Sequence, residues 1–343
     1  LQLENNFDSN LMYGENYGYR SGLNKSMVEH LSNKIKYIEN LTNLNQDSII
    51  LDIGSNDGTS LNAYKAKCKK IGMDPSAAKF KKYYNSDIIL VENFFNSNSI
   101  KELIGLNKVD VITSIAMFYD LEDPNDFVSQ ISDIISDNGI WHFEQSYMPS
   151  MLRTCSYDTL CHEHLEFYSL QVVKNLLKKN NLKIIDVSLN DINGGSFAVT
   201  ACKKTAAYVE NTAVINMLLK EEEDLKLNTV DPYLNFKIKS EKHKQKLREF
   251  LIDLKNNGKK VFGYGASTKG NVLLQYCEID SNLVPFIAEV NEEKFGSFTP
   301  GTLIPIISEK EAKEMKPDYF LVLPWHFKNM IIEKEKSTLN KGI

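Results

Sequence analysis

Residues 156–168, Ser-Tyr-Asp-Thr-Leu-Cys-His-Glu-His-Leu-Glu-Phe-Tyr, contain two histidines among acidic and aromatic side chains. Titratable side chains at this density are unusual for a connecting loop, and loops on a rigid sheet are where catalytic groups concentrate. A histidine oriented by a neighbouring carboxylate can act as a general base near neutral pH. The sequence therefore predicts a base in this stretch, with Glu163 as its helper. If the base lies elsewhere, Tyr119, Glu144 and Cys161 are the next candidates.

Two other interpretations of the histidine pair remain open. His162 and His164 lie two residues apart and would share a face of an extended segment, which would allow a metal site. That spacing differs from the helical H-E-x-x-H zinc signature, and no further cluster of ligands accompanies it in the sequence, so we predict no metal. The pair could also be purely structural.

A second chemical feature is a glycine turn that follows an apolar run. Residues 49–53, Ile-Ile-Leu-Asp-Ile, are typical of a buried strand in a parallel sheet. Gly54 and Gly58 let the backbone approach a ligand closely, and a helix starting at Thr59 offers unpaired N–H groups. The spacing differs from the dinucleotide fingerprint G-x-G-x-x-G and resembles the cofactor loop of class I methyltransferases, which holds S-adenosylmethionine. The cofactor contacts expected from this loop are Asp52, Gly54, Ser55, Asn56 and Gly58.

Asp74 ends a second apolar strand, 20 residues after Gly54. An acidic side chain at that point can accept two hydrogen bonds from a ribose diol, as in dinucleotide folds. We therefore expect Asp74 to hold the ribose of S-adenosylmethionine. The plainer alternative is an ordinary strand-to-helix turn followed by an exposed aspartate. Further cofactor contacts are expected after the third and fourth strands, from Asn93, Phe94 and Ser114.

A third feature is the turn from Gly263 to Gly270, Gly-Tyr-Gly-Ala-Ser-Thr-Lys-Gly. Its third glycine comes two places too late for the dinucleotide fingerprint. It also differs from the Walker loop, because no Lys-Ser or Lys-Thr follows a glycine at the required position. A glycine-rich turn that enters a helix and carries a lysine is still a suitable anion site. We expect Tyr264 and Lys269 to contact the substrate there. The alternative is a tight turn with an exposed lysine.

The elements that would position these residues alternate between strands and helices. Strands are expected at residues 49–53, 70–73, 88–91, 109–115 and 140–143, the last launched by a turn at 137–139. Residues 182–187 and 196–202 follow without an intervening helix and are expected to form an antiparallel edge. This order predicts an α/β fold, a mostly parallel Rossmann-like sheet of the class I methyltransferase type. Ligands of such sheets bind at the carboxyl ends of the strands.

The domain organisation follows from the same pattern and from length, since 343 residues exceed one ordinary core. Residues 1–46 hold a tyrosine-rich loop, Asn16 to Gly22, and a helix over 26–41; the loop is either a packed turn or a flap over the cofactor. Residues 47–203 form the cofactor domain and 204–257 a charged helical connector. Residues 258–343 restart the pattern as a second, smaller Rossmann-like domain, with further strands expected at 284–288, 303–306 and 319–323.

Composition bounds the environment and the partners. The net charge is −5, the pI is about 5.8, and no basic stripe with interleaved aromatics suggests a nucleic-acid partner. The longest apolar runs are strand-sized, so neither a transmembrane span nor a signal peptide is expected. The five cysteines are dispersed and include no C-x-x-C pair. That pattern favours a reducing cytoplasm.

Taken together, these stretches resemble the sugar C-methyltransferases that act on nucleotide-linked 4-keto-6-deoxy sugars, in the right order along the whole chain. The resemblance implies S-adenosylmethionine on the first domain, the nucleotide-sugar against the second, and His164 as the base that removes a proton beside the ketone. The motifs are Tyr17-Gly18-Tyr19-Arg20-Ser21, residues 52–58, Tyr157-Asp158 with His162-Glu163-His164, Gly194-Gly195-Ser196, and residues 263–271. The substrate contacts expected on this basis are Tyr17, Tyr19, Gly195, Ser196, Tyr264 and Lys269.

The chain departs from that family at four places. Members usually begin with a small cysteine-rich zinc domain, which precedes the part that matches here. Cys161 stands where the family has the tyrosine of Tyr-His-Glu-His, Tyr119 lies near a common histidine, and Ala198 replaces an arginine. These changes surround the expected substrate and leave the cofactor residues intact. Methyl transfer is therefore better supported by the sequence than the identity of the acceptor.

Two alternative functions remain open at this point. One is an O-methyltransferase acting on a sugar hydroxyl, which would also use a histidine base. The other is a non-catalytic protein that binds nucleotide-sugars and whose histidines are structural. The sequence does not distinguish a monomer from a weak homodimer.

Overall fold

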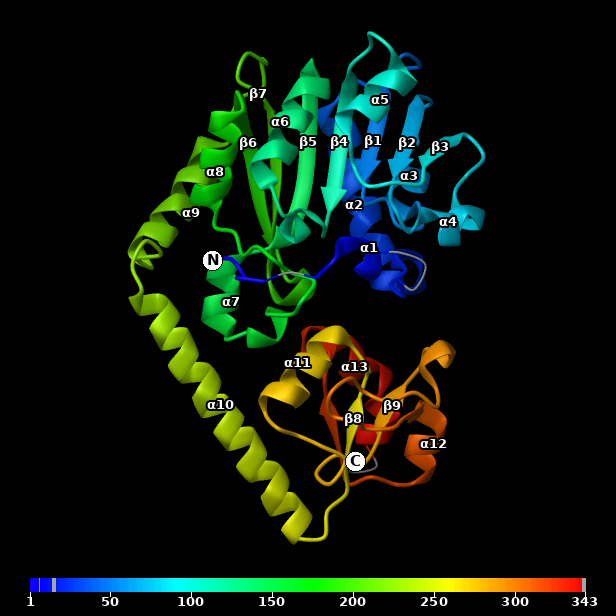
Figure 1. Cartoon of the computed structure of the whole chain (residues 1–343), viewed down its shortest axis with the longest axis vertical. Coiled ribbons are helices and arrows are strands. Elements are labelled where there is room, and N and C mark those ends of the chain that lie inside the picture. Colours follow the sequence, from blue (N-terminus) through cyan, green and yellow to red (C-terminus); the bar gives the residue numbers. More distant parts are fainter. Residues whose placement is uncertain (6, 14–16, 341–343) are drawn as a thin grey trace. The chain divides into compact units, whose positions relative to one another are not determined.

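A computed structural model describes residues 1–5, 7–13 and 17–340, and these form two compact units (Figure 1). The first unit comprises residues 1–148, 162–190 and 195–225, and the second comprises residues 149–161, 191–194 and 226–343. Asn16, part of the predicted tyrosine-rich loop, lies outside the described residues. The chain thus passes between the units several times.

The first unit is built on a seven-stranded sheet with the order β3-β2-β1-β4-β5-β7-β6. Strands β1 to β5 are parallel, and β7 pairs antiparallel with both β5 and β6. This is the mostly parallel sheet with an antiparallel edge that the sequence predicts. The strands are β1 (Ile49–Ile53), β2 (Lys69–Met73), β3 (Ile88–Val91), β4 (Val109–Ile115), β5 (Ile135–Ser146), β6 (Leu182–Asn190) and β7 (Ser196–Lys203).

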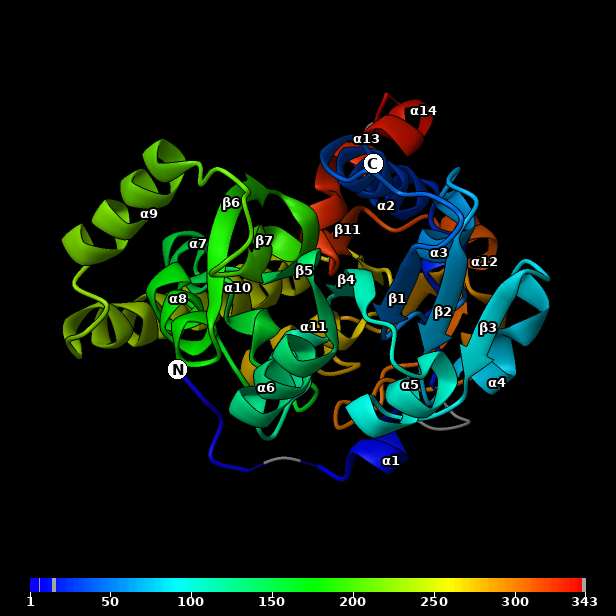
Figure 2. The same ribbon diagram turned by 90° about the horizontal axis from the view of Figure 1, so that it is seen from above.

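Helices cover both faces of this sheet (Figure 2). On one face α2 (Lys25–Leu41) begins at the cap Asn24 and buries Leu31, Ile35 and Ile38 at helical spacing. Each such side chain contributes about 1.5–3 kcal/mol by leaving water. α3 (Thr59–Ala63) packs on the same face. The opposite core is formed by α5 (Ser97–Ile104), α6 (Pro124–Ile134), α8 (Leu170–Lys179) and α9 (Thr212–Asp224).

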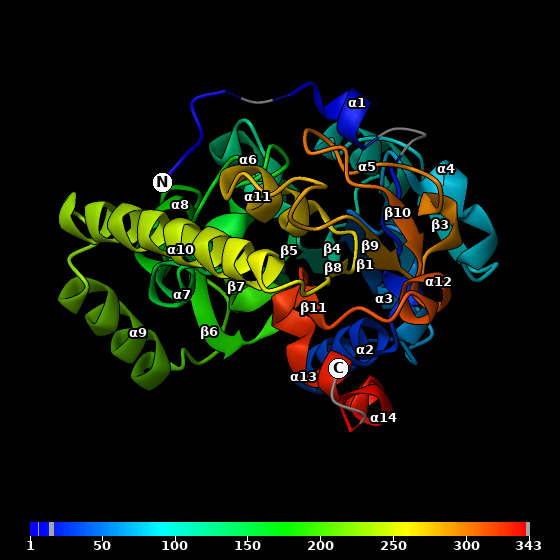
Figure 3. The same ribbon diagram turned by 90° about the horizontal axis from the view of Figure 1, so that it is seen from below.

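The second unit holds a smaller, four-stranded parallel sheet with the order β10-β9-β8-β11. Figure 3 shows α11 on one side of this sheet and α12 and α13 on the other. A long helix, α10, precedes the sheet. The elements are α10 (Asp231–Asn256), β8 (Val261–Tyr264), α11 (Thr268–Tyr276), β9 (Ile287–Glu289), β10 (Ile306–Ser308), α12 (Glu309–Glu314), β11 (Tyr319–Val322) and α13 (Lys328–Lys334).

The remaining helices are short. They are α1 (Ser9–Met12), α4 (Ala77–Phe80), α7 (Met148–Thr154) and α14 (Lys336–Leu339). Several single turns of 3₁₀ helix lie between the main elements, and three of them matter below: η3 (Phe118–Asp120), η4 (Tyr157–Thr159) and η5 (Ile192–Gly194). Among the described residues, no helix is both long and apolar enough to cross a membrane.

Some predicted strand ends are wrong. Residues 137–139 do not form a turn before β5 but lie inside it, next to a register shift between Val109 and Val111. In the second unit, β9 starts after Pro285, which has no N–H to give to a ladder. β10 starts only at Ile306, because Leu303 has a left-handed backbone with φ +52°. Such a backbone cannot continue a strand.

The observed units also differ from the predicted domains in how they use the chain. The prediction divides the chain into consecutive blocks, whereas residues 149–161 and 191–194 belong to the second unit although they lie between segments of the first. The predicted connector over 204–257 is helical, and it is split between the units at Leu225.

Candidate active site

The glycine turn after β1 has an unusual backbone. Gly54, Asn56 and Gly58 all have positive φ angles, +72°, +50° and +75°. A side chain at Gly58 would also meet the ring of Tyr84 at 2.7 Å. Glycine is therefore required at Gly58 by both conformation and space. The turn carries its N–H groups to the carboxyl end of β1, ahead of α3.

Asp74 lies at the end of β2, where the sequence predicts it, and its carboxylate faces this turn. One oxygen accepts a 2.8 Å hydrogen bond from the Asn56 N–H, and the other accepts from the Ser76 N–H at 2.7 Å. Asp74 is 7% exposed, so it is not the exposed aspartate of the plainer interpretation. It links the turn after β1 to the turn after β2.

Two other predicted cofactor residues point elsewhere. Asp52 is buried and accepts a 2.5 Å hydrogen bond from Thr113 on β4, and burial raises its pKa to about 7. Ser114 is fully buried, and its hydroxyl accepts a hydrogen bond from the indole of Trp141 in the core. The contact between Ser114 and the cofactor stays a prediction. Both residues support the strands beneath the turn.

The other predicted cofactor residues lie at the same edge of the sheet. Ser55 shares a 2.8 Å hydrogen bond with the Tyr84 hydroxyl. Asn93 and Phe94 follow β3 directly, where Asn93 is exposed and accepts from the Phe94 N–H. The carboxyl ends of β1, β2 and β3 therefore present one continuous row of predicted residues.

The tyrosine-rich loop is attached to the glycine turn. The Asn56 side chain accepts from the Ser21 N–H at 2.9 Å and donates to the Tyr19 carbonyl at 3.0 Å. Lys79 donates to the Tyr17 carbonyl. Burial raises the pKa of Tyr17, and the charges of Glu163, Asp120 and Asp74 raise it further. Tyr17 thus lies among acidic groups from three different loops.

The histidine loop is fixed to the turn η3 that follows β4. The Tyr119 carbonyl accepts from the N–H groups of Leu165 and Glu166, at 3.0 and 2.9 Å. The rings of Tyr119 and His164 lie 4.2 Å apart between centroids. His162 instead packs edge-on against Phe7, with centroids 5.4 Å apart. The two histidines therefore have different surroundings.

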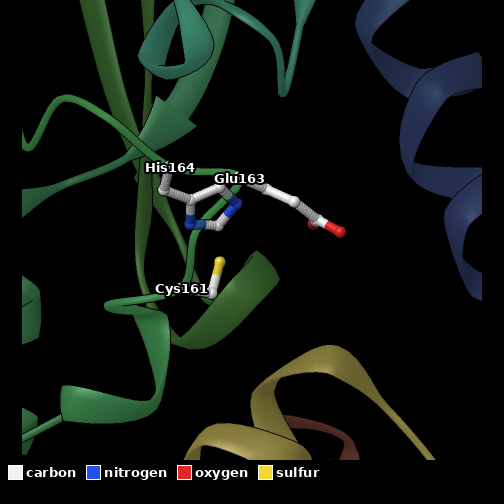
Figure 4. Close-up of side chains that lie close together, drawn as sticks. All are labelled: Cys161, Glu163 and His164. Carbon is white, nitrogen blue, oxygen red and sulfur yellow. The ribbon is translucent and has the colours of Figure 1, made fainter. Parts of the chain in front are cut away.

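Figure 4 shows Cys161, Glu163 and His164, three near neighbours in the chain. One ligand-capable atom from each of the three side chains lies within 4.8 Å of the others. Burial raises the pKa of Glu163, and the charge of His162 opposes this. The sequence predicts no metal here.

Asp120 was missed by the sequence analysis. It follows Tyr119 directly, and Tyr13 donates a hydrogen bond to its carboxyl group. Its Oδ1 atom is buried and has no hydrogen-bond partner among the described residues. Burial raises the pKa of Asp120 well above its ordinary value, and the Glu163 charge adds to this. The only signal in the sequence was an acid at the end of a strand that was already expected to line the site.

Glu144, another candidate for the base, has bonding partners at both of its carboxylate oxygens. Its carboxylate accepts from Lys34 and Asn190 and pairs with His30, each at 2.6 Å. Burial acts to raise the pKa of Glu144, but His30 and Lys34 outweigh it and lower the pKa to about 2. A carboxylate with this pKa is a poor base. Its cross-strand neighbour is Ala198.

Gly195 and Ser196, two of the predicted substrate residues of the first unit, lie where β7 begins. The Gly195 carbonyl accepts from the Tyr147 N–H at 3.0 Å, and Gly195 has φ +124°. Ser196 starts β7 opposite Ser146 and is 1% exposed. These two residues therefore shape the backbone at the antiparallel edge.

The predicted substrate residues of the second unit are mainly structural. Tyr264 is buried, its hydroxyl donates to Glu335 at 2.9 Å, and its ring packs against Phe320. The contact between Tyr264 and the substrate stays a prediction. Lys269 is tied to the Asn193 carbonyl at 2.6 Å. Burial lowers the pKa of Lys269, and the charge of Asp158 opposes this.

Comparisons with known proteins match the chain in two consecutive parts. Residues 27–187 match the family model of a methyltransferase domain, and residues 191–343 match that of the C-methyltransferase C-terminal domain. The chain is 26% identical over 346 aligned residues to the C-methyltransferase NovU of Streptomyces niveus, covering 100% of this chain and 81% of that protein.

Two solved structures resemble about half of the chain each. A complex of the Haloferax volcanii Trm112 methyltransferase activator with a methyltransferase matches with 13% identity and a TM-score of 0.43, over 53% of this chain and 94% of that one. Magnesium protoporphyrin IX methyltransferase of Synechocystis PCC 6803 with bound SAH matches with 11% identity and a TM-score of 0.40, over 55% and 90%.

The sheet and the two matched domains define a class I methyltransferase that uses S-adenosylmethionine. Within that class, residues 191–343 match the C-terminal domain of C-methyltransferases, and the whole chain is similar to one such enzyme. The residues present fit the cofactor. The positive φ angles at Gly54 and Gly58 let the backbone of this turn approach a ligand closely, and Asp74 lies beside it.

Proposed function

We propose that this protein methylates a carbon next to the ketone of a nucleotide-linked keto-deoxy sugar. The main support is the pairing of His164 with Tyr119, in the same unit and at the same edge of the sheet as the glycine turn. A titratable ring is therefore held at the end of β4, where ligands of such sheets bind. The match to the C-methyltransferase C-terminal domain favours carbon as the acceptor atom.

In this proposal His164 is the general base. Its ring takes the proton from the carbon beside the ketone, and the electron pair of the C–H bond passes through that carbon to the ketone oxygen. Histidine suits this step because its ordinary pKa lies near neutrality. Tyr119 orients the ring, and the hydrogen bonds at the Tyr119 carbonyl keep the loop in place.

The residues around the glycine turn hold S-adenosylmethionine, which supplies an electrophilic methyl group on a sulfonium. Asp74 binds its ribose, while the turn from Gly54 to Gly58 approaches its amino-acid end. Holding the reacting atoms near contact distance can remove about 7–11 kcal/mol of the barrier in the best oriented cases. Excluding water favours the methyl transfer, because the negative charge of the enolate and the positive charge of the sulfonium neutralise each other in that step.

The nucleotide part of the substrate is assigned to the second unit. The turn from Gly263 to Gly270 enters α11, and Ser267 caps that helix by accepting from the Gly270 N–H at 3.0 Å. Lys269 contributes positive charge in the first turn of α11. We propose that this region binds the diphosphate, with Lys269 also holding the Asn193 backbone.

The test follows the acidic carbon proton directly. The protein is incubated in deuterated solvent with a nucleotide-linked 4-keto-6-deoxy sugar, first without cofactor and then with labelled S-adenosylmethionine. Carbon methylation requires exchange of that proton without cofactor and label on a carbon with it. Label on oxygen without exchange would establish O-methylation instead. Absence of both label and exchange across a panel of such sugars would overturn the proposed function.

A further inference from the structure

Asp120 is a half-buried acid with a buried Oδ1 atom, and the proposed function does not use it. An unpaired carboxyl oxygen inside a protein costs about 1–3 kcal/mol or more. Natural structures retain few such groups, and those that persist need an explanation. The Oδ1 atom of Asp120 has no partner among the described residues, whereas Tyr13 donates to the same carboxyl group. The carboxyl group is thus held by Tyr13, while its Oδ1 atom is unsatisfied within the part of the chain that the structure describes.

The position of Asp120 relates it to the base. It is the last residue of η3, directly after Tyr119, whose ring contacts His164. η3 also holds the histidine loop in place, because two N–H groups of that loop donate hydrogen bonds to the Tyr119 carbonyl. The acid and the base therefore come from two segments that are bonded together.

The groups that face Asp120 come from four further parts of the first unit, one of them Tyr168, just ahead of α8. Tyr13 follows α1, Tyr17 belongs to the tyrosine-rich loop, and Glu163 precedes His164 in the histidine loop. None of these carries a fixed positive charge. Burial comes first among the causes that raise the pKa of Asp120, Tyr13 and Glu163. The surroundings therefore favour a neutral carboxylic acid.

A neutral acid can do what a carboxylate cannot, which is to donate a hydrogen bond through its own O–H. Donors aimed at an oxygen where negative charge develops are among the strongest contributors to catalysis, since removing one costs roughly 10²–10³ in rate. The reaction proposed above develops negative charge on the ketone oxygen when His164 takes the proton.

We propose that the Asp120 carboxyl group, held by Tyr13 through one oxygen, donates a hydrogen bond from the other to the ketone oxygen of the acceptor. No proton is transferred in this step. The O–H bond of Asp120 stays intact while the ketone oxygen gains negative charge. The hydrogen bond between them weakens again when the carbonyl re-forms. Asp120 is then a catalytic residue of the methyl transfer, and Tyr13 is a positioning residue. This inference rests on the proposed function.

Three variants test it with the solvent-exchange assay. Asp120→Asn keeps a neutral donor of the same shape, so exchange should stay within about tenfold of wild type. Asp120→Ala removes the donor, and exchange and turnover should both fall by roughly 10²–10³-fold with little change in KM. Asp126→Asn, an exposed position in α6, is the matched control and should leave the rates unchanged.

The pH profile separates a donor from a merely structural acid. In wild type, exchange should fall at high pH as Asp120 ionises, and Asp120→Asn should lose that fall. Calorimetric binding of S-adenosylmethionine shows whether each variant is folded. Near wild-type exchange in Asp120→Ala, or equal losses in the folded Ala and Asn variants, would overturn the assignment. Absence of exchange in wild type would instead overturn the proposed function.

Discussion

At the scale of single residues, the two loop histidines are distinguished by what they touch. His164 lies against Tyr119 at the sheet edge, whereas His162 packs against Phe7. His164→Asn should fold and bind S-adenosylmethionine, but turnover and solvent exchange should fall about 10²–10⁴-fold, the usual share of a general base. His162→Asn is the control and should change mainly the melting temperature. Equal turnover in both variants would place the base elsewhere.

A second prediction at this scale concerns Asp74. Its carboxylate holds the turn through Asn56 and is expected to hold the cofactor ribose as well. Asp74→Ala should weaken S-adenosylmethionine binding by about 1–3 kcal/mol, the cost of leaving hydrogen-bond partners unpaired. Isothermal calorimetry measures this. Asp87→Ala, an exposed acid paired with Lys70, should leave the affinity unchanged. Unchanged affinity in Asp74→Ala would remove the assignment.

At the scale of elements, β1 and β4 share a buried hydrogen bond between Asp52 and Thr113. Burial raises the pKa of Asp52 to about 7 in the folded state, from 3.8 ordinarily. Between those pH values the folded protein binds more protons than the unfolded one, so stability falls as pH rises. Asp52→Asn should abolish the part of the stability loss between about pH 4 and pH 7 that comes from ionisation of Asp52. Melting temperatures across this range test it, and parallel wild-type and variant curves would contradict it.

The helix α11 supplies another prediction, because Lys269 joins its first turn to η5 through the Asn193 carbonyl. Lys269→Met keeps the length of the side chain but removes its charge and hydrogen bond. The KM for the nucleotide-sugar should rise, while the affinity for S-adenosylmethionine stays the same. Lys255→Met, at the end of α10, serves as a control. A loss of cofactor affinity with unchanged KM would contradict the assignment.

Periodicity and glycine spacing predicted the elements well, since both are local properties. The strand β1, its glycine turn and the closing pair β6 and β7 were all expected from the sequence. The sequence could not reveal which side chains would be satisfied by neighbours far along the chain. Tyr264 is engaged by Glu335, 71 residues away, and Ser114 by Trp141. Asp120 was missed because its hydrogen bond to Tyr13 joins residues that are far apart in the sequence.

At the scale of the whole molecule, the second unit includes two short segments, 149–161 and 191–194, that lie between segments of the first unit in the chain. Tyr157 shares hydrogen bonds with His243 and Cys277, and Asp158 accepts from the indole of Trp325 at 2.8 Å. A fragment of residues 226–343 would lack Tyr157 and Asp158, so His243, Cys277 and Trp325 would lose these hydrogen bonds. We expect this fragment to melt well below the same unit in the full chain, or not to fold. A fragment that unfolds at the temperature of the full chain would contradict this.

The five points at which the chain passes between units, after Met148, Cys161, Asn190, Gly194 and Leu225, bear on how such proteins can be recombined. An acceptor-binding half cannot be exchanged between relatives as one contiguous cassette. A working chimera must carry the two short segments, 149–161 and 191–194, together with residues 226–343. For the same reason, a single protease cut within α10 should leave both fragments associated in a native gel, since neither unit is released by one break.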